Sequence, residues 1–162
     1  MPKIKLRYQR VSDAKRFYEI LNNPNFIYIS LKLKSIQEEK EWLAKGKERR
    51  KNNLSYDFAI VYQNKVIGAV GVRVNPHLKG NGDIGYFIDE AYWGKGIATE
   101  AVKLIEKFAY KVLKLYRLEL RIKPKNKASI KVAIKNGYRK EGLLRGRKGK
   151  NEDCYLFAKV KD

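Results

Sequence analysis

The chain has few of the residues that cross-link small proteins or hold metal ions. Its 162 residues include one cysteine, Cys154, and one histidine, His77. A single cysteine excludes an internal disulfide, and a zinc site would usually need three or four Cys, His or carboxylate ligands. Nothing in the sequence around these two residues supports Cys–His nucleophilic catalysis. We therefore expect no metal ion and no cysteine nucleophile.

Long apolar runs are also absent. No segment approaches the roughly 20 apolar residues that cross a bilayer, and the opening MPKIKLRYQR lacks the apolar segment of a signal peptide. We expect a cytoplasmic protein without a membrane partner. Four prolines and twelve glycines leave little room for a long disordered tract. Since one domain typically has about 150 residues, the length predicts a single domain over residues 1–162.

Acidic residues are scarce relative to basic ones. There are 17 Asp and Glu against 37 Lys and Arg, which gives a formal net charge of +20. Such a field attracts polyanions, whether nucleic acid, an anionic membrane or a phosphorylated ligand. Lysines that only keep a small protein soluble are the simpler alternative. Association with RNA or a ribosome is therefore one expectation to test.

Hydrophobic periodicity predicts a mixed α/β domain in the order β-α-α-β-β-β-α-β-α-β-β. Ser12 and Asp13 offer N-cap chemistry for the first helix, and Ser35 to Glu38 matches a capping box for the second. Gly137 is expected to stop the last helix. The predicted strands are 4–8, 56–62, 66–72, 83–89, 118–122, 138–144 and 154–160, and the predicted helices are 12–22, 35–51, 97–112 and 127–136.

The strongest chemical signal is a Gly-x-Gly loop, Gly94 to Gly96, directly before the longest predicted helix. Two glycines one residue apart allow a tight turn, so that successive N–H groups converge at a helix N-terminus and favour an anion there. The third glycine of a dinucleotide fingerprint and the Gly-Lys-Ser/Thr of a Walker loop are missing. The loop therefore predicts a phosphate or pyrophosphate site, and a tight turn without a ligand is the alternative.

Two segments resemble the GNAT acetyltransferases. Residues 83–101, DIGYFIDEAYWGKGIATEA, are similar to the acetyl-CoA segment of that superfamily. Residues 126–142, NKASIKVAIKNGYRKEG, are similar to the Asn-x-x-Ser and Gly-Phe-x-x-Glu-Gly pattern of the branch that acetylates ribosomal-protein N-termini and related amines. The resemblance implies the GNAT fold, with splayed central strands, and acetyl-CoA as co-substrate.

The resemblance also implies roles for particular residues. Backbone groups of Tyr86, Phe87 and Ile88 would pair with the pantetheine arm. Asn126 would contact the cofactor beyond the splayed strands, and Ser129 would lie near the thiol. The amides that would hold the pyrophosphate belong to Trp93, Gly94, Lys95, Gly96, Ile97, Ala98 and Thr99.

The proton-donating residue departs from the pattern of the superfamily. Many GNAT enzymes place a tyrosine seven residues after the asparagine to protonate the leaving thiolate, and Ala133 stands there in this chain. Ser129 is the expected substitute, with Tyr138 and Tyr155 as alternatives. Asp83 is the expected proton acceptor, with Glu119 on the neighbouring predicted strand, although strand-end capping or an ion pair would also explain Asp83.

Two functions are therefore open. The first is an acetyl-CoA-dependent N-acetyltransferase in which a primary amine, most simply a protein N-terminus, attacks the thioester directly. The second is a basic RNA- or ribosome-binding module with the same fold and no turnover. The positive field disfavours polyamine substrates. The first two helices, the segment 26–33 and the basic loop 145–150 are expected to choose the acceptor.

Overall fold

Seven strands form one sheet in the order β1-β2-β3-β4-β5-β7-β6. The computed structural model describes residues 1–29, 31–147 and 149–162. Adjacent strands are antiparallel except β4 and β5, which run parallel. The strands are β1 (Ile4–Tyr8), β2 (Ser55–Tyr62), β3 (Lys65–Val74), β4 (Asn81–Ile88), β5 (Arg117–Ile122), β6 (Arg139–Leu144) and β7 (Cys154–Val160).

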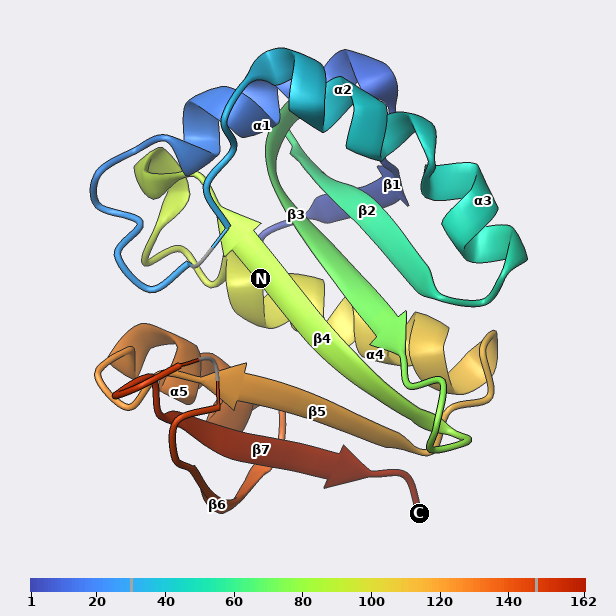
Figure 1. Cartoon of the computed structure of the whole chain (residues 1–162), viewed down its shortest axis with the longest axis vertical. Coiled ribbons are helices and arrows are strands. Elements are labelled where there is room, and N and C mark those ends of the chain that lie inside the picture. The colour runs from blue at the N-terminus through green and yellow to red at the C-terminus, as the bar shows by residue number, and fades with distance from the viewer. Residues whose placement is uncertain (30, 148) are drawn as a thin grey trace.

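Helices cover both faces of this sheet (Figure 1). A small buried cluster that includes Phe17, Leu43 and Ala69 joins α1 and α2 to one face. A larger cluster that includes Ile105 and Leu118 lies under α4 on the opposite face. This arrangement confirms the predicted mixed α/β class. The helices are α1 (Ala14–Leu21), α2 (Ile36–Ala44), α3 (Gly46–Lys51), α4 (Ile97–Lys111) and α5 (Lys127–Lys135), with 3-10 turns at Val11–Asp13 and Glu90–Tyr92.

The helix predicted over residues 35–51 is in fact two helices. Ser35 caps the first as expected, because its hydroxyl accepts a hydrogen bond from the Glu38 N–H at 3.0 Å. The chain then leaves helical geometry at Lys45 before α3 begins at Gly46. Glycine is a poor helix former, so the break occurs where helix propensity is weakest.

Asp13 is the N-cap residue of α1, as expected, but its carboxylate accepts no hydrogen bond from that helix. It accepts instead from the Arg10 N–H and from both Nη atoms of Arg7, at 2.7 to 2.8 Å. Arg7 lies on β1, six residues before Asp13, so it is not part of the sequence pattern that marks a helix start. Strand bounds shift slightly, since β4 begins at Asn81 and Tyr138 lies just before β6.

The sheet divides at the parallel pair. β4 and β5 are paired over three positions, from Asn81 with Arg117 to Asp83 with Glu119. Beyond these positions β4 continues to Ile88 and β5 to Ile122, but the two strands are no longer paired with each other. Figure 1 shows the two strands diverging beyond this point. The divergence confirms the expected splay and leaves one edge of β4 open.

The part of the chain that the structure describes has neither a membrane-spanning helix nor a metal-binding cluster. None of the described helices is both long and apolar enough to cross a membrane. Across residues 1–29, 31–147 and 149–162, no three His, Cys, Asp or Glu side chains gather in a way that could hold a metal ion.

Candidate acetyl-group transfer site

The open edge of β4 is formed by alternate residues. The Asp89 N–H donates to the Ile67 carbonyl of β3, so odd-numbered residues of β4 turn their backbone groups toward β3. Tyr86 and Ile88 therefore turn theirs toward the splay. Phe87 does not, because its carbonyl lies against Gly68 of β3 and its ring packs edge-on against Phe17. Only two of the three residues expected to face the splay do so.

One backbone acceptor at this edge is already used by the chain itself. The indole Nε1 of Trp93 donates to the Ile88 carbonyl at 2.7 Å. The Trp93 ring also meets Phe26 edge-on, with centroids 5.4 Å apart. Trp93 thus fixes the start of the glycine loop against the end of β4. The sequence pointed only to the Trp93 amide, because no local pattern reports where an indole N–H finds its acceptor.

The glycine loop exposes a run of backbone N–H groups. Gly94 and Gly96 have φ of +73° and +75°, a region that glycine adopts without strain. Gly96 is the N-cap of α4 and supplies no capping side chain. Among the described residues, no acceptor pairs with the N–H groups from Gly94 to Thr99. Free donors at the N-terminus of a fifteen-residue helix form an anion-binding surface.

A hydroxyl pair bridges the splay. The Tyr86 hydroxyl, from β4, donates to the Ser129 Oγ, in the first turn of α5, at 3.0 Å. Burial raises the pKa of the Tyr86 hydroxyl, which keeps it protonated. Asn126 caps α5, since its Oδ1 accepts from the Ser129 N–H at 3.2 Å. The predicted residues Asn126 and Ser129 therefore lie together, and the structure adds Tyr86 as their side-chain partner.

The other candidate acids are less accessible. Ala133, which has no proton to give, is fully buried in the core, and Tyr138 is 4% exposed. Burial, together with the nearby carboxylate of Glu106, raises the pKa of Tyr138 far above its ordinary value. Tyr155 is half-buried with the Lys140 ammonium 3.5 Å from its ring centroid. Of these residues, Ser129 alone is joined to the edge of β4 by a side-chain hydrogen bond.

Asp83 lies at the apex of the splay within an ion-pair network. Its Oδ1 is 2.9 Å from Arg121 Nη1, and Arg121 also contacts Glu119 Oε2 at 3.0 Å. Arg117 extends the network from Glu119 to Glu141. The ion pair that was the alternative explanation for Asp83 is therefore present, with an arginine as partner. The side chain remains 30% exposed, so it still reaches solvent at the apex.

The segment after α1 spans the opening between the strands. At the end of the segment that lies near β4, the side-chain amides of Asn23 and Asn25 donate to the Glu90 carboxylate. The Tyr28 hydroxyl donates to the Lys125 carbonyl, beyond β5, at 3.1 Å. Residues 26–33 of this segment and residues 145–150 of the basic loop were both expected to help choose the acceptor. Ser30 and Lys148 in those ranges lie outside the described residues.

A buried carboxylate lies on α2, which covers the face of the sheet that bears Asp83. Glu39 is 7% exposed, and burial raises its pKa to about 7, with smaller contributions from Glu38 and Asp57. Arg49 acts in the opposite direction without cancelling the effect. No sequence pattern marked Glu39, because an exposed glutamate on the same helix looks identical in the sequence.

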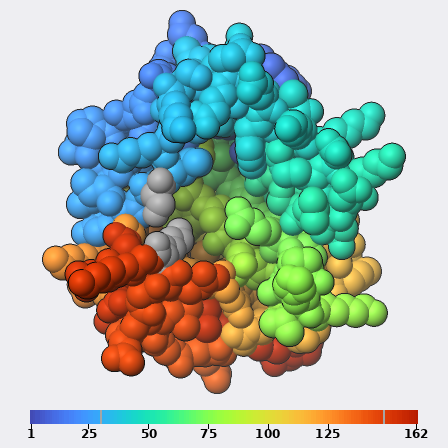
Figure 2. All heavy atoms as spheres, in the orientation of Figure 1, coloured from blue at the N-terminus to red at the C-terminus, as the bar shows by residue number. Residues whose placement is uncertain are grey.

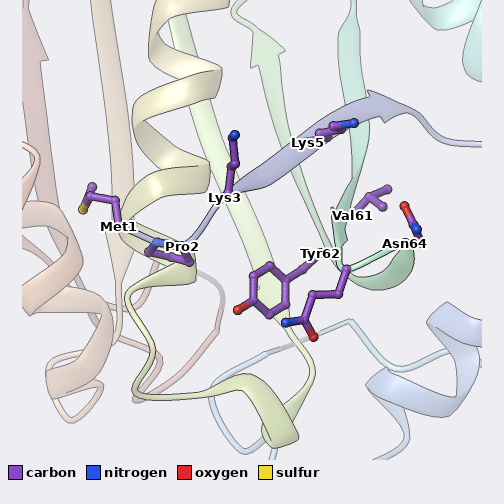
Figure 3. Close-up of a pocket in the computed structure, with 8 residues that line it drawn as sticks. Met1, Pro2, Lys3, Lys5, Val61, Tyr62 and Asn64 are labelled. Atoms are coloured by element: carbon purple, nitrogen blue, oxygen red, sulfur yellow. The ribbon is translucent and has the colours of Figure 1, made fainter.

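A pocket of about 440 Å³ lies apart from these residues (Figure 3). Its walls come from the start of the chain and from the β2–β3 hairpin. It comes near the candidate site at Pro2, whose Cδ lies 3.9 Å from the position that a Cβ on Gly96 would take. The lining residues are Met1, Pro2, Lys3, Lys5, Val61, Tyr62, Gln63 and Asn64, none of which is a predicted site residue.

Comparison with known proteins agrees with this geometry. Residues 3–139 match the family model of the acetyltransferase (GNAT) domain. The uncharacterized N-acetyltransferase p20 of Bacillus licheniformis is 36% identical over 109 residues, which cover 64% of this chain and 61% of that protein. The chain spans only 60% to 63% of the length of three curated relatives that include this one.

Two solved structures extend the similarity over the fold. The ribosomal-protein-S5-alanine acetyltransferase from Vibrio fischeri superposes with a TM-score of 0.88 at 26% identity, covering 100% of this chain and 95% of that one. The microcin C7 self-immunity acetyltransferase MccE, in complex with acetyl-CoA and AMP, superposes with a TM-score of 0.85 at 25% identity, covering 98% and 92%. With a family model that matches most of its length, a parted β4–β5 pair and a glycine loop that opens α4, this chain belongs to the GNAT acetyltransferase-domain family.

Proposed function

We propose that this protein is an acetyl-CoA-dependent N-acetyltransferase that acetylates a primary amine, most specifically the N-terminal amine of a protein. The main support is the free edge of β4 running into the unpaired N–H groups from Gly94 to Thr99. The edge fits an extended chain with amide groups, and the N–H cluster fits a pyrophosphate. The solved relative named for a ribosomal-protein substrate supports the finer choice of acceptor.

The residues present fit acetyl-CoA. The Tyr86 backbone offers a free N–H and C=O at the open edge, and the glycine loop would hold the diphosphate through its amides. Asn126 would lie beyond the splay, close to Ser129. When bound, acetyl-CoA supplies a thioester whose acetyl group is transferred. The chain's own residues orient the two partners and move protons.

Proton movement is assigned to Asp83 and Ser129. A neutral amine is the nucleophile, so the acceptor ammonium must lose a proton, which Asp83 accepts directly or through water. Ser129 donates its hydroxyl proton to the departing sulfur and recovers a proton from the attacking nitrogen, which loses its second proton as the amide forms. Because the Tyr86 hydroxyl donates to Ser129 Oγ, the serine's own hydrogen is free to point elsewhere. Asp83 is thus the base of this proposal and Ser129 its acid.

The proposal is tested by mixing the protein with acetyl-CoA and peptides that begin with Ala, Ser or Met, and measuring free CoA thiol and peptide mass. Acetylation at the α-amine is expected. The same peptides with blocked N-termini are the control and should remain unchanged. Acetylation of spermidine but of no peptide would contradict the choice of acceptor while leaving the transfer chemistry intact.

Asp83→Asn should lower kcat/KM by at least about tenfold, since general-base catalysis typically contributes 100-fold or more. Its acetyl-CoA affinity should not change. The pH–rate profile should lose the limb that reports the base. Glu141→Gln is the matched control, because it removes the far end of the same ion-pair network. An Asp83→Asn profile that follows the wild type would remove Asp83 from this role.

Ser129→Ala should lower kcat by about tenfold or more with little change in the KM for acetyl-CoA, as expected for loss of a general acid. Tyr86→Phe should have a smaller effect, because it removes only the hydrogen bond to Ser129 Oγ. Steady-state kinetics of the two variants would measure this difference. Wild-type kcat in Ser129→Ala would show that sulfur is protonated by another group or by water.

The charge of +20 supports a second partner, an RNA or ribosomal surface that presents the acceptor. A few phosphates on one CoA do not need so large an excess of cations. If the chain binds RNA with an affinity that falls steeply with salt and transfers no acetyl group, the alternative function, a basic binding module, replaces the enzyme. Acetyl transfer with no RNA binding would mean that the positive charge serves only to keep the protein soluble.

A further inference from the structure

Three strands align a carboxylate and two glycines on the face of the sheet that α1 and α2 cover. Asp57 of β2 is opposite Gly71 of β3, which is opposite Gly85 of β4. Residues directly opposite each other place their side chains on the same face. The neighbouring row, Ala59 with Ala69 and Phe87, is buried under α1 and α2. We call Asp57, Gly71 and Gly85 the glycine row.

The glycine row ends in open space beside the splay. A Cβ placed on Gly85 would meet no atom of the described residues within 4 Å. Gly85 is two residues beyond Asp83, where pairing with β5 stops. Figure 2 shows this face hollowed between the cyan α2–α3 region and the orange C-terminal segment, with green from the middle of the sheet at the bottom of the hollow. An acceptor therefore has room to reach the open edge of β4 from above Gly85.

Asp57 points along this row. Its Oδ2 accepts from the Ser55 hydroxyl at 2.8 Å and lies 3.7 Å from Arg49 Nε. Its Oδ1 has no hydrogen-bond donor among the described residues and extends over Gly71, 2.5 Å from where a Cβ would stand. The side chain is 24% exposed. One oxygen is thus held in place, while the other is directed toward Gly85.

The missing Cβ atoms matter because they leave this path clear. Adjacent strands lie about 4.8 Å apart, so Oδ1 over Gly71 is about one strand spacing from the position above Gly85. That distance suits a hydrogen bond bridged by one water molecule to a cation held there. Asp83 stands in the next row, but Arg121 occupies its Oδ1. The ion pair of Asp57 is longer, with Arg49 Nε 3.7 Å from its Oδ2, so the carboxylate of Asp57 is held less closely by its arginine than that of Asp83.

We propose that Asp57 holds the ammonium group of the acceptor above Gly85, so that the glycine row is the acceptor floor of the site. The inference rests on the proposed function and assigns Asp57 a positioning role, whereas Asp83 takes the proton. It restricts the acceptor to a cationic amine that approaches Asp57 over the two glycines. A protein N-terminus with its α-ammonium foremost has this shape and charge.

The test compares substitutions at positions whose backbone conformation other residues also adopt, so that each one changes the acceptor floor. Asp57→Asn removes the charge, Gly85→Ala adds a methyl group to open space, and Gly71→Ala displaces the Asp57 carboxylate, whose Oδ1 is the nearest atom. Gly142→Ala is the matched control, because in the part of the chain that the structure describes its Cβ also meets nothing within 4 Å, and it lies on the distant β6. The acceptors are the Ala-, Ser- and Met-initiated peptides, and acetyl-CoA binding is followed by thermal shift.

The expected result is a KM for the peptide raised about tenfold or more in Asp57→Asn, as for the loss of a charge-assisted hydrogen bond. Gly85→Ala and Gly71→Ala should raise it several-fold. In all three the acetyl-CoA thermal shift should stay at the wild-type value, and kcat should fall less than kcat/KM. Gly142→Ala should match the wild type throughout.

Two other outcomes would overturn the inference in different ways. If the wild type acetylates the peptides and the three variants keep its KM, the acceptor floor lies elsewhere and the proposed function stands. If the wild type binds acetyl-CoA but acetylates none of the peptides, the proposed acceptor is wrong and the assignment of Asp57 fails with it.

Discussion

Replacing Gly96 by glutamate is expected to abolish the stabilisation of the fold by acetyl-CoA. A ligand present at 100 times its Kd stabilises the wild type by about 2.7 kcal/mol, which raises Tm by several degrees in a domain of this size. The variant places a carboxylate among the N–H groups that would hold the pyrophosphate, and two like charges in that position repel. A thermal-shift titration at near-physiological salt measures the loss.

Gly96→Ala separates charge from backbone strain. Gly96 has a φ of +75°, so any side chain there is strained, but a methyl group would meet only Pro2 at 3.9 Å. The alanine variant should therefore lose some stability and retain most of the acetyl-CoA shift. ATP serves as a polyanion control for the wild type. An equal shift with ATP, or a full shift in Gly96→Glu, would show that the loop is a general anion site or a simple turn.

The second large effect concerns stability and pH. Burial raises the pKa of Glu39 to about 7 from an ordinary value of 4.5. Between these two values the folded state binds more protons at Glu39 than the unfolded state, so this residue lowers stability as pH rises through that window. Glu39→Gln resembles the protonated form, so its free energy of unfolding should not show this loss as pH rises. At pH 8 it should be more stable than the wild type by on the order of 3 kcal/mol.

Denaturant unfolding at several pH values from 4 to 8 checks this expectation. The difference between Glu39→Gln and the wild type should shrink toward zero at the acid end and grow as pH rises. Glu41→Gln is the control on the same helix, because Glu41 is exposed. A stability difference for Glu39→Gln that does not vary with pH would mean that Glu39 titrates as an ordinary surface carboxylate.

Much of the fold was visible in local sequence patterns. Period-two runs located the strands to within a few residues, and the apolar spacing from Ile97 onward located α4. The glycine loop was predicted because its chemistry is local: two glycines and a helix start. The helix break at Lys45 was missed, since a basic run with one glycine fits one helix or two equally well.

The parts that sequence did not reveal depend on pairing between distant segments. Phe87 was assigned to the splay, but the register between β3 and β4 turns its backbone away. The contact between Tyr86 and Ser129 joins residues 43 positions apart. Asp57 becomes a site residue only when β2, β3 and β4 are aligned, because neither glycine of its row is near it in the chain.

The short β4–β5 pairing has a consequence for how the sheet exchanges hydrogen with solvent. Along one strand, the Gly85 and Phe87 amides face β3, whereas the Tyr86 and Ile88 amides face the gap. Amide protection should thus alternate residue by residue within β4, in place of the uniform protection of an interior strand. A bound ligand that pairs with the open edge would act as a substitute strand. The Tyr86 and Ile88 amides should then be as protected as those of Gly85 and Phe87.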